Sequence, residues 1–205
     1  MKPSPEPLDR LVSKAVPLML DNIDTDIITP IDRMVAGTIV EFAFEPLRFD
    51  GEGRLREDCA LNDPAYAGAK ILIAGANFGC GSSRETAVWA IHGMGFRAVI
   101  AASFGDIFFA NCPKNGIVPI ELPSERVAEL ADHARRGREI EICVSKAVVG
   151  PANGQPISFQ ITPIRQRALV EALDDLDLAR AHESEISDYE RRLMQERPWM
   201  LPNQS

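Results

Sequence analysis

The chain has 205 residues, and its 22 Lys and Arg against 30 Asp and Glu give a net charge of −8. This excess of acid argues against non-specific nucleic-acid binding, because no surplus of cations is available to neutralise phosphates. No apolar run approaches the roughly 20 residues that a membrane helix needs, and prolines and charges stand where a signal peptide would have its apolar stretch. We therefore expect a cytoplasmic protein that binds neither nucleic acid nor membrane.

The N-terminal third of the chain shows few regular patterns. Residues 1–14 have three prolines among the first seven residues and predict a mobile N-terminal arm. Residues 15–20 are mainly apolar and predict a short strand. Residues 29–65 have no clear periodicity, so they form either a functional loop or elements that the pattern does not reveal.

A regular alternation begins at Lys70. Continuous apolar runs, typical of strands buried on both faces, predict strands at 70–75, 97–102 and 116–122. The segments that follow them predict helices at 84–94, 104–112 and 123–136. Strand, turn, helix and strand in this order indicate a parallel α/β core over residues 70–136.

The C-terminal part of the chain predicts accessory structure. Residues 139–144 and 156–161 predict two antiparallel strands, joined by the turn-rich sequence VVGPANGQ. Residues 164–173 predict a helix, and residues 180–205 a charged helical tail. With no internal repeat and no low-complexity segment, residues 1–205 are interpreted as a single domain.

The cysteines give no metal-binding pattern. Cys59, Cys80, Cys112 and Cys143 lie far apart, and no pair has the CxxC spacing of zinc or iron–sulfur ligands. In a cytoplasm they are expected to stay reduced. We therefore expect that this chain holds no metal by itself.

The segment NFGCGSSRE, residues 77–85, carries the chemistry. It connects a predicted buried strand to a predicted helix, and so lies at the carboxyl edge of the sheet, where α/β folds bind ligands. Gly79 and Gly81 allow a tight turn and a close approach to a ligand. Free amides at the start of the helix attract a carboxylate or phosphate, and Arg84 offers a two-pronged donor that suits a carboxylate.

Several general interpretations of this segment compete. It lacks the GxxxxGK[ST] and GxGxxG patterns of phosphate-binding loops and the GxSxG of a nucleophile elbow. A purely structural interpretation makes Ser82 or Ser83 a helix N-cap and Arg84 half of a surface ion pair. The residues by themselves leave this alternative open.

Longer motifs place the chain in a family. Residues 75–120, from GANFGCGSSRE through SFGDIFFAN to KNGIVPI, strongly resemble the small subunits of 3-isopropylmalate dehydratase, the swivelling domain of the aconitase superfamily. DNIDTDIITP at 21–30 and LNDPAYAGAKILIAG at 61–75 resemble further motifs of that family. The resemblance implies an α/β fold, a three-layer β/β/α swivelling domain with a parallel core sheet and accessory antiparallel strands.

The resemblance also implies an activity. Members of this family isomerise 2-isopropylmalate to 3-isopropylmalate in leucine biosynthesis, through dehydration to an unsaturated intermediate and rehydration. The small subunit is active only with a large subunit, which carries the [4Fe–4S] cluster. The partners implied are therefore the large subunit and a small hydroxy-dicarboxylate substrate.

The family pattern assigns roles to particular residues. Ser82 matches the base, and Arg84 is the expected cationic clamp on the substrate carboxylate, where charge builds up as the neighbouring proton leaves. The expected substrate-binding residues are Ser83, Gly81, Arg33 and Asp26, and the expected supporting residues are Asn77, Gly79, Cys80 and Asp24.

Two interpretations of Asp24 and Asp26 compete. On a strand their spacing would place both side chains on one face. The resemblance implies that Asp26 supports the active site and orients a basic residue. The alternative is a solvated turn in which the aspartates make local hydrogen bonds. Cys80 either lies near the cluster without binding it or packs as a small apolar side chain.

An apolar loop is expected to contact the substrate side chain. Ile31, Met34 and Val35 are the candidates for the wall that an isopropyl group needs. Thr86 stands where many members of the family have histidine, and two alternatives to an isopropylmalate dehydratase stay open. The departure at Thr86 favours the first alternative, a related dehydratase acting on citramalate or a methyl-substituted malate. The second alternative is independent of Thr86: a non-catalytic module that captures small dicarboxylates at the loop of Gly81 to Arg84.

Overall fold

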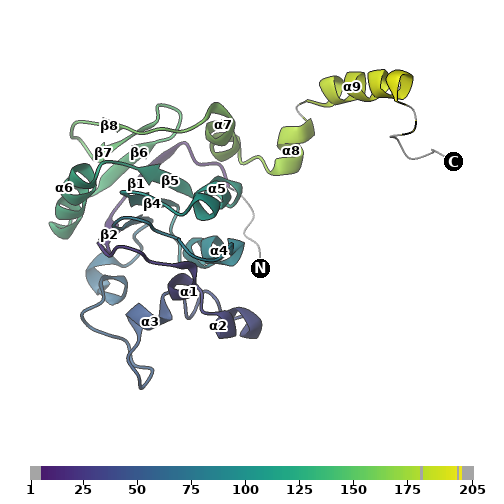
Figure 1. The fold of residues 1–205 in the computed structure, drawn as a ribbon. Coiled ribbons are helices and arrows are strands. Elements are labelled where there is room, and N and C mark those ends of the chain that lie inside the picture. Colours follow the sequence, from purple (N-terminus) through teal and green to yellow (C-terminus); the bar gives the residue numbers. More distant parts are fainter. Residues whose placement is uncertain (1–5, 181, 198, 200–205) are drawn as a thin grey trace. The chain divides into compact units, whose positions relative to one another are not determined.

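A four-stranded parallel sheet lies at the centre of the fold, with strand order β2-β3-β4-β5 (Figure 1). The computed structural model describes residues 6–180, 182–197 and 199. The sheet consists of β2 (Ala15–Pro17), β3 (Ile71–Ile73), β4 (Ala98–Ala101) and β5 (Val118–Glu121). Every strand residue except Glu121 is buried, which explains the continuous apolar runs. The predicted parallel core is confirmed, and β2 adds a fourth strand to it.

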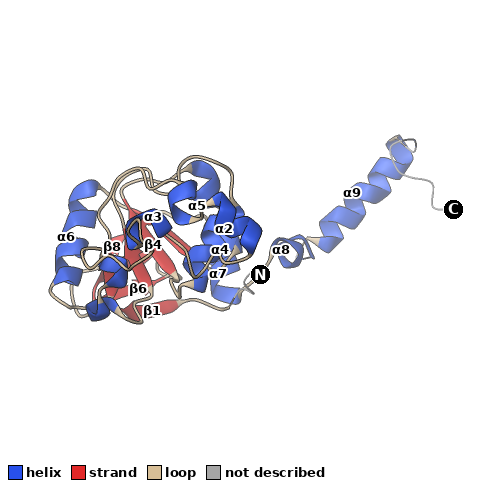
Figure 2. Cartoon of the chain, turned by 90° about the horizontal axis from the view of Figure 1, so that it is seen from below, coloured by secondary structure: helices blue, strands red, loops and turns tan. Residues whose placement is uncertain are grey.

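Alternate residues of these strands face two separate apolar clusters. Leu72 and Val99 pack with α4 (Glu85–Gly93) and α5 (Asp106–Lys114), whereas Ile71 and Ile100 face α6 (Ser124–Arg135). Both views place α4 and α5 on one side of the strands and α6 on the other (Figure 1; Figure 2). The sheet is therefore covered on both faces, as parallel sheets require.

A second, antiparallel sheet has the order β1-β6-β7-β8 and shares the cluster that contains α6. Its strands are β1 (Arg10–Ser13), β6 (Ile140–Cys143), β7 (Val148–Pro151) and β8 (Ile157–Ser158). The accessory antiparallel structure is confirmed, but not as one pair. The sequence VVGP forms β7 between β6 and β8, so the expectation that this segment is only a turn-rich connection is wrong.

The N-terminal segment also differs from its prediction. Arg10–Ser13 pairs with Ile140–Cys143 in antiparallel register, and Leu8 and Leu11 are buried. The predicted mobile arm over residues 1–14 is therefore wrong for the described residues from 6 onward. Residues 1–5 lie outside the described residues.

Short helices fill most of the segment for which the sequence gave no periodicity. They are α1 (Thr25–Ile28), α2 (Ile31–Ala36), α3 (Glu45–Arg48), η1 (Ala60–Asn62) and η2 (Pro64–Tyr66). Ile28 and Phe44 are fully buried in the cluster under α4, so this segment belongs to the core rather than covering it loosely.

The chain divides into two compact units, Met1–Ala172 and Leu173–Ser205. The first ends with α7 (Pro163–Glu171), which confirms the helix predicted there. The second contains α8 (Asp175–Arg180), which ends where the expected helical tail begins, and α9 (Glu183–Glu196), which lies within that tail. The single-domain interpretation stays a prediction. None of the helices within the described residues combines the length and apolar character that crossing a bilayer requires.

His92, near the end of α4, predicts a pH dependence of stability. Burial, and then the charge of Arg97, lower the pKa of His92 below its ordinary value, and its buried Nε2 has no hydrogen-bond partner. The unfolded chain binds the proton of His92 more readily than the folded chain. The contribution of His92 to the free energy of unfolding is therefore fully present above about pH 6.5 and is lost as the pH falls below that value. His92→Phe should flatten this part of the curve in urea unfolding between pH 7.5 and 5. An equally steep curve in the variant would contradict the assignment.

Candidate active site

The loop between β3 and α4 lies at the carboxyl edge of the parallel sheet, held by the segments that follow β2 and β4. The Gly79 N–H donates to the carbonyl of Ile23 at 2.7 Å, and the Phe78 N–H donates to the carbonyl of Ser103 at 3.0 Å. Single parallel bridges join Asp24 to Cys80 and Phe78 to Phe104. We call residues 78–84 the serine loop. Its first half thus extends the sheet beyond the regular strands.

Both glycines of the serine loop adopt a conformation that other residues rarely adopt. Gly79 has φ +72° and Gly81 φ +92°. At Gly79 a Cβ atom would lie 2.2 Å from Cγ of Phe108, whereas at Gly81 the nearest atom, Cβ of Asp24, would be 3.4 Å away. Gly79 is therefore required for both backbone angle and space, and Gly81 mainly for backbone angle.

Thr25 fixes the position of Ser82. The Thr25 hydroxyl donates to the Ser82 carbonyl at 3.1 Å and accepts from the Ser82 N–H at 3.2 Å. Thr25 is 1 % exposed, whereas Ser82 and Ser83 are exposed. The sequence interpretation missed Thr25, and its only signal was the position between Asp24 and Asp26.

The serines do not cap the following helix. Arg84 occupies the N-cap position of α4, and its side chain makes no capping hydrogen bond. The structural alternative for Ser82 and Ser83 as N-caps is therefore wrong. Both residues are exposed, in a loop whose backbone is hydrogen-bonded to Thr25 at Ser82.

Arg84 and Asp26 are brought together. The Arg84 Nη1 donates to Oδ1 of Asp26 and to the carbonyl of Thr29 at 3.4 Å. The Arg84 side chain is 16 % exposed and the Asp26 side chain 58 %, so a largely buried guanidinium is paired with a carboxylate that is open to solvent. This is the arrangement expected of an aspartate that orients a basic residue.

Asp24 and Asp26 belong to a helix start and not to a strand. Asp24 is the N-cap of α1, and its Oδ1 accepts the Ile27 N–H at 2.7 Å. The expectation that a strand places both aspartates on one face is wrong, and the alternative of local hydrogen bonding describes Asp24. The four-residue helix nevertheless turns Asp26 toward Arg84.

Arg33 is engaged with its own neighbours. It lies on α2, donates to the two carboxylate oxygens of Glu45 at 2.8 and 2.5 Å, and stacks 3.8 Å from the ring centre of Phe42. These hydrogen bonds hold the pKa of Glu45 below its ordinary value. Arg33 borders a cavity of about 580 Å³ that Phe42, Glu45 and Phe49 also line.

The three apolar residues expected to contact the substrate side chain all lie on α2. Ile31 is 52 % and Val35 84 % exposed, one turn apart on the same helix face. Met34 is half-buried, and its sulfur accepts from the Thr86 hydroxyl at 3.6 Å. The position at which the sequence departs from the family pattern is thus in contact with the predicted apolar wall.

Asn77, directly before the serine loop, and Cys80, within it, hold the loop through their hydrogen bonds. Asn77 has φ +58°, its N–H donates to the Ser103 hydroxyl at 2.8 Å, and its side-chain amide donates to Oδ1 of Asn22 at 2.8 Å. The Cys80 carbonyl accepts from the Thr25 N–H at 2.9 Å, while its thiol is free and half-buried. Among the described residues, no group of three or more His, Cys, Asp and Glu could hold a metal ion.

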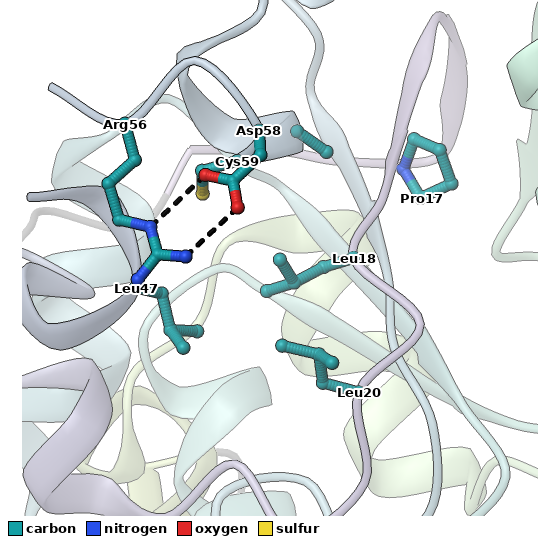
Figure 3. Close-up of a pocket in the computed structure, with 8 residues that line it drawn as sticks. Pro17, Leu18, Leu20, Leu47, Arg56, Asp58 and Cys59 are labelled. Atoms are coloured by element: carbon teal, nitrogen blue, oxygen red, sulfur yellow. Dashed lines mark hydrogen bonds and ion pairs between the residues drawn. The ribbon is translucent and has the colours of Figure 1, made fainter.

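A separate apolar cavity of about 310 Å³ opens between the end of β2, α3 and η1 (Figure 3). Leu18, Leu20 and Leu47 face it, and Arg56 donates to Asp58 at 3.1 and 2.9 Å beside it. None of the residues predicted for the site lines this cavity. It is therefore distinct from the serine loop.

Comparison with known proteins decides the family. The family described as the aconitase C-terminal domain matches residues 8–125. The 3-isopropylmalate dehydratase small subunit of Paramagnetospirillum magneticum is 44 % identical over 95 % of this chain and 100 % of its own length. The chain belongs to the 3-isopropylmalate dehydratase small-subunit family. Small subunit 2 of Bordetella parapertussis is 43 % identical over 90 % of this chain and 94 % of its own.

A solved structure supports the same assignment. The crystal structure of the 3-isopropylmalate dehydratase from Methanocaldococcus jannaschii has a TM-score of 0.62 and 25 % sequence identity. It covers 88 % of this chain and 99 % of that one. The predicted swivelling-domain fold, with its parallel core sheet and accessory antiparallel strands, is confirmed.

Gly79→Ala should destabilise the protein by about 2–4 kcal/mol, because a positive φ and a steric conflict with Phe108 add together. Urea unfolding measures this change. Gly53→Ala is the matched control, because Gly53 has a similar φ of +76° but open space around its Cβ position. Equal losses in the two variants would show that contact with Phe108 is not the constraint.

Proposed function

We propose that this chain is the small subunit of a heteromeric hydro-lyase that isomerises 2-isopropylmalate to 3-isopropylmalate in leucine biosynthesis. The relatives that carry this name match it over nearly their whole length. The name of those relatives implies a large-subunit partner, and we propose that the chain is active only with that partner, in the cytoplasm.

The two exposed serines of the serine loop, next to Arg84, are the observation that carries the proposal. Ser82 and Ser83 stand at the edge of the sheet, directly before the N-terminus of α4, with the guanidinium of Arg84 held nearby by Asp26. Backbone amides, hydroxyls and a guanidinium are the donors that a dicarboxylate requires. The site is open, which suits a centre completed by a second subunit.

The proposed chemistry follows from these groups. Removing a proton next to a carboxylate builds negative charge on that carboxylate, and we assign Arg84 to stabilise it. Ser82 is the proposed base, with its deprotonated oxygen stabilised by Arg84 and by the amides of the turn at Gly81. Ser83 and the Gly81 N–H are proposed to hold a substrate carboxylate.

Asp26 and Arg33 have different proposed roles. Asp26 is proposed to orient Arg84 and to share the guanidinium with a substrate carboxylate. Arg33 is proposed as a second carboxylate-binding residue, and this role requires that it leave at least one of its hydrogen bonds to Glu45. Asn77, Gly79, Cys80 and Asp24 are proposed to support the loop through the contacts described above.

The exposed face of α2 is proposed to select the alkyl group. Ile31 and Val35 present apolar surface to solvent, and Met34 lies behind them against Thr86. Such contacts discriminate between alkyl groups by about 1–3 kcal/mol, or roughly 10- to 200-fold. A comparison of 2-isopropylmalate with citramalate therefore tests the proposed substrate.

A [4Fe–4S] cluster is proposed to reside on the large subunit. When bound there, it supplies a Lewis acid for the substrate hydroxyl. The cysteines of this chain do not suit a cluster. Cys59 and Cys112 are buried, and neither Cys80 nor Cys143 belongs to a group of three or more possible metal ligands among the described residues.

Ser82→Ala should lower kcat about 10²- to 10⁴-fold in the complex with the large subunit, because the base for proton removal is lost. Anaerobic turnover of 2-isopropylmalate, followed by the ultraviolet absorbance of the unsaturated intermediate, measures this. Ser124→Ala, an exposed serine at the start of α6, is the matched control and should keep wild-type turnover.

Unchanged turnover in Ser82→Ala would contradict the role of Ser82 as the base. A wild-type complex with no turnover would favour a binding module. A preference for citramalate would keep the residues and change the substrate.

A further inference from the structure

Asn115, the C-cap residue of α5, is completely buried, and both polar atoms of its side chain are hydrogen-bonded. Its Oδ1 accepts the Trp89 indole N–H at 3.0 Å, and its Nδ2 donates to Oε1 of Glu85 at 3.0 Å and to the Asn111 carbonyl at 2.9 Å. The Asn111 carbonyl belongs to the last turn of α5, where carbonyls lack partners within the helix. One side chain therefore completes α5 and joins it to α4.

The partners of Asn115 define which residue type can occupy this position. The indole N–H of Trp89 only donates, so it requires an acceptor, whereas the Asn111 carbonyl and an ionised Glu85 only accept. A side-chain amide satisfies both demands at this length. An aspartate would place a second carboxylate against Glu85, and an apolar residue would leave the part-buried indole N–H without its partner.

These contacts reach the end of the serine loop. Glu85 is the first residue of α4 and directly follows Arg84, and Trp89 lies one turn further on. Asn115 thus anchors the helical turn from which the loop emerges. It does so from α5, whereas Thr25 and Asp26 hold the loop from the side of α1.

The same helix also holds the beginning of the loop. Phe108 on α5 occupies the space beside Gly79, and Gly105, directly before α5, lies so close to Gly79 that a Cβ there would be 2.6 Å from the Gly79 carbonyl oxygen. The serine loop is therefore fixed at its start by Phe108 and at its end by Asn115, both from α5.

We propose that Asn115 is a positioning residue for catalysis: it fixes the first turn of α4 and so sets the position of Ser82 and Arg84. This inference deepens the proposed function and rests on it. Reacting groups must be held within about 0.5 Å of their productive geometry, and a displacement of 1 Å can cost about 10²-fold in rate. Asn115 meets this demand without contacting the substrate.

Asn115→Ala tests the inference in the chain assembled with its large subunit. We expect kcat per assembled complex to fall at least tenfold, together with faster hydrogen exchange of the amides in residues 81–88. Exchange in β4 should stay as in the wild type, because the sheet is not anchored by Asn115. Asn111→Ala is the matched control, because the Asn111 carbonyl enters the network and its side chain does not. It should keep both wild-type values.

Trp89→Phe provides a milder variant in case Asn115→Ala assembles poorly. It retains an aromatic ring and removes only the N–H that Asn115 accepts, so we expect a two- to fivefold loss of kcat and a smaller rise in exchange over the same residues.

The inference is overturned if both variants keep wild-type kcat and exchange. It is also overturned if exchange rises equally in residues 81–88 and in β4, since that would show a general loss of stability. The exchange measurement needs no turnover. A wild-type complex that does not turn over 2-isopropylmalate would therefore refute the proposed function, while exchange in Asn115→Ala separately decides whether Asn115 positions the loop.

Discussion

The paired hydrogen bonds between the Thr25 hydroxyl and the backbone of Ser82 are the constraint on which the candidate site depends. The buried hydroxyl of Thr25 bonds to both the backbone N–H and the backbone carbonyl of Ser82. The backbone of Ser82 is therefore fixed while its side chain stays exposed. Gly79 and Gly81 permit the required turn, and Asp26, one residue after Thr25, holds Arg84. A four-residue helix thus determines the position of the proposed base and orients the proposed clamp.

The rest of the fold supports this arrangement from three directions. The serine loop follows β3 of the parallel sheet and ends at the N-terminus of α4, where backbone N–H groups have no partner within the helix. Phe108 of α5 contacts the serine loop near the start of the loop, at Gly79. Asn115, at the end of α5, contacts the first turn of α4. The antiparallel sheet and α6 cover the opposite face of the parallel sheet and complete its burial. No part of this support covers Ser82 and Ser83, which suits a site completed by a large subunit.

The sequence was sufficient where local pattern reflects burial and insufficient where distant contacts decide. Continuous apolar runs identified β3, β4 and β5, because strands buried on both faces carry no polar alternation. The sequence of β7 looked like a turn because of its glycine, but Gly150 is required there since a Cβ would lie 2.7 Å from the Gln155 carbonyl oxygen. The motif gave Ser82 and Arg84 directly. Thr25 and Asn115 were missed because their partners are 57 and 26 to 30 residues away, a separation that no local pattern reveals.

The most direct test of this account is the turnover of Thr25→Val and Thr25→Ser in the complex with the large subunit. Valine has nearly the shape of threonine but cannot bond to Ser82, whereas serine keeps the hydroxyl. The account predicts that the valine variant loses at least about tenfold in kcat per assembled complex, because a displaced reacting group is costly. It predicts that the serine variant stays within about threefold of the wild type. Wild-type kcat in the valine variant would show that the hydroxyl of Thr25 does not set the position of Ser82.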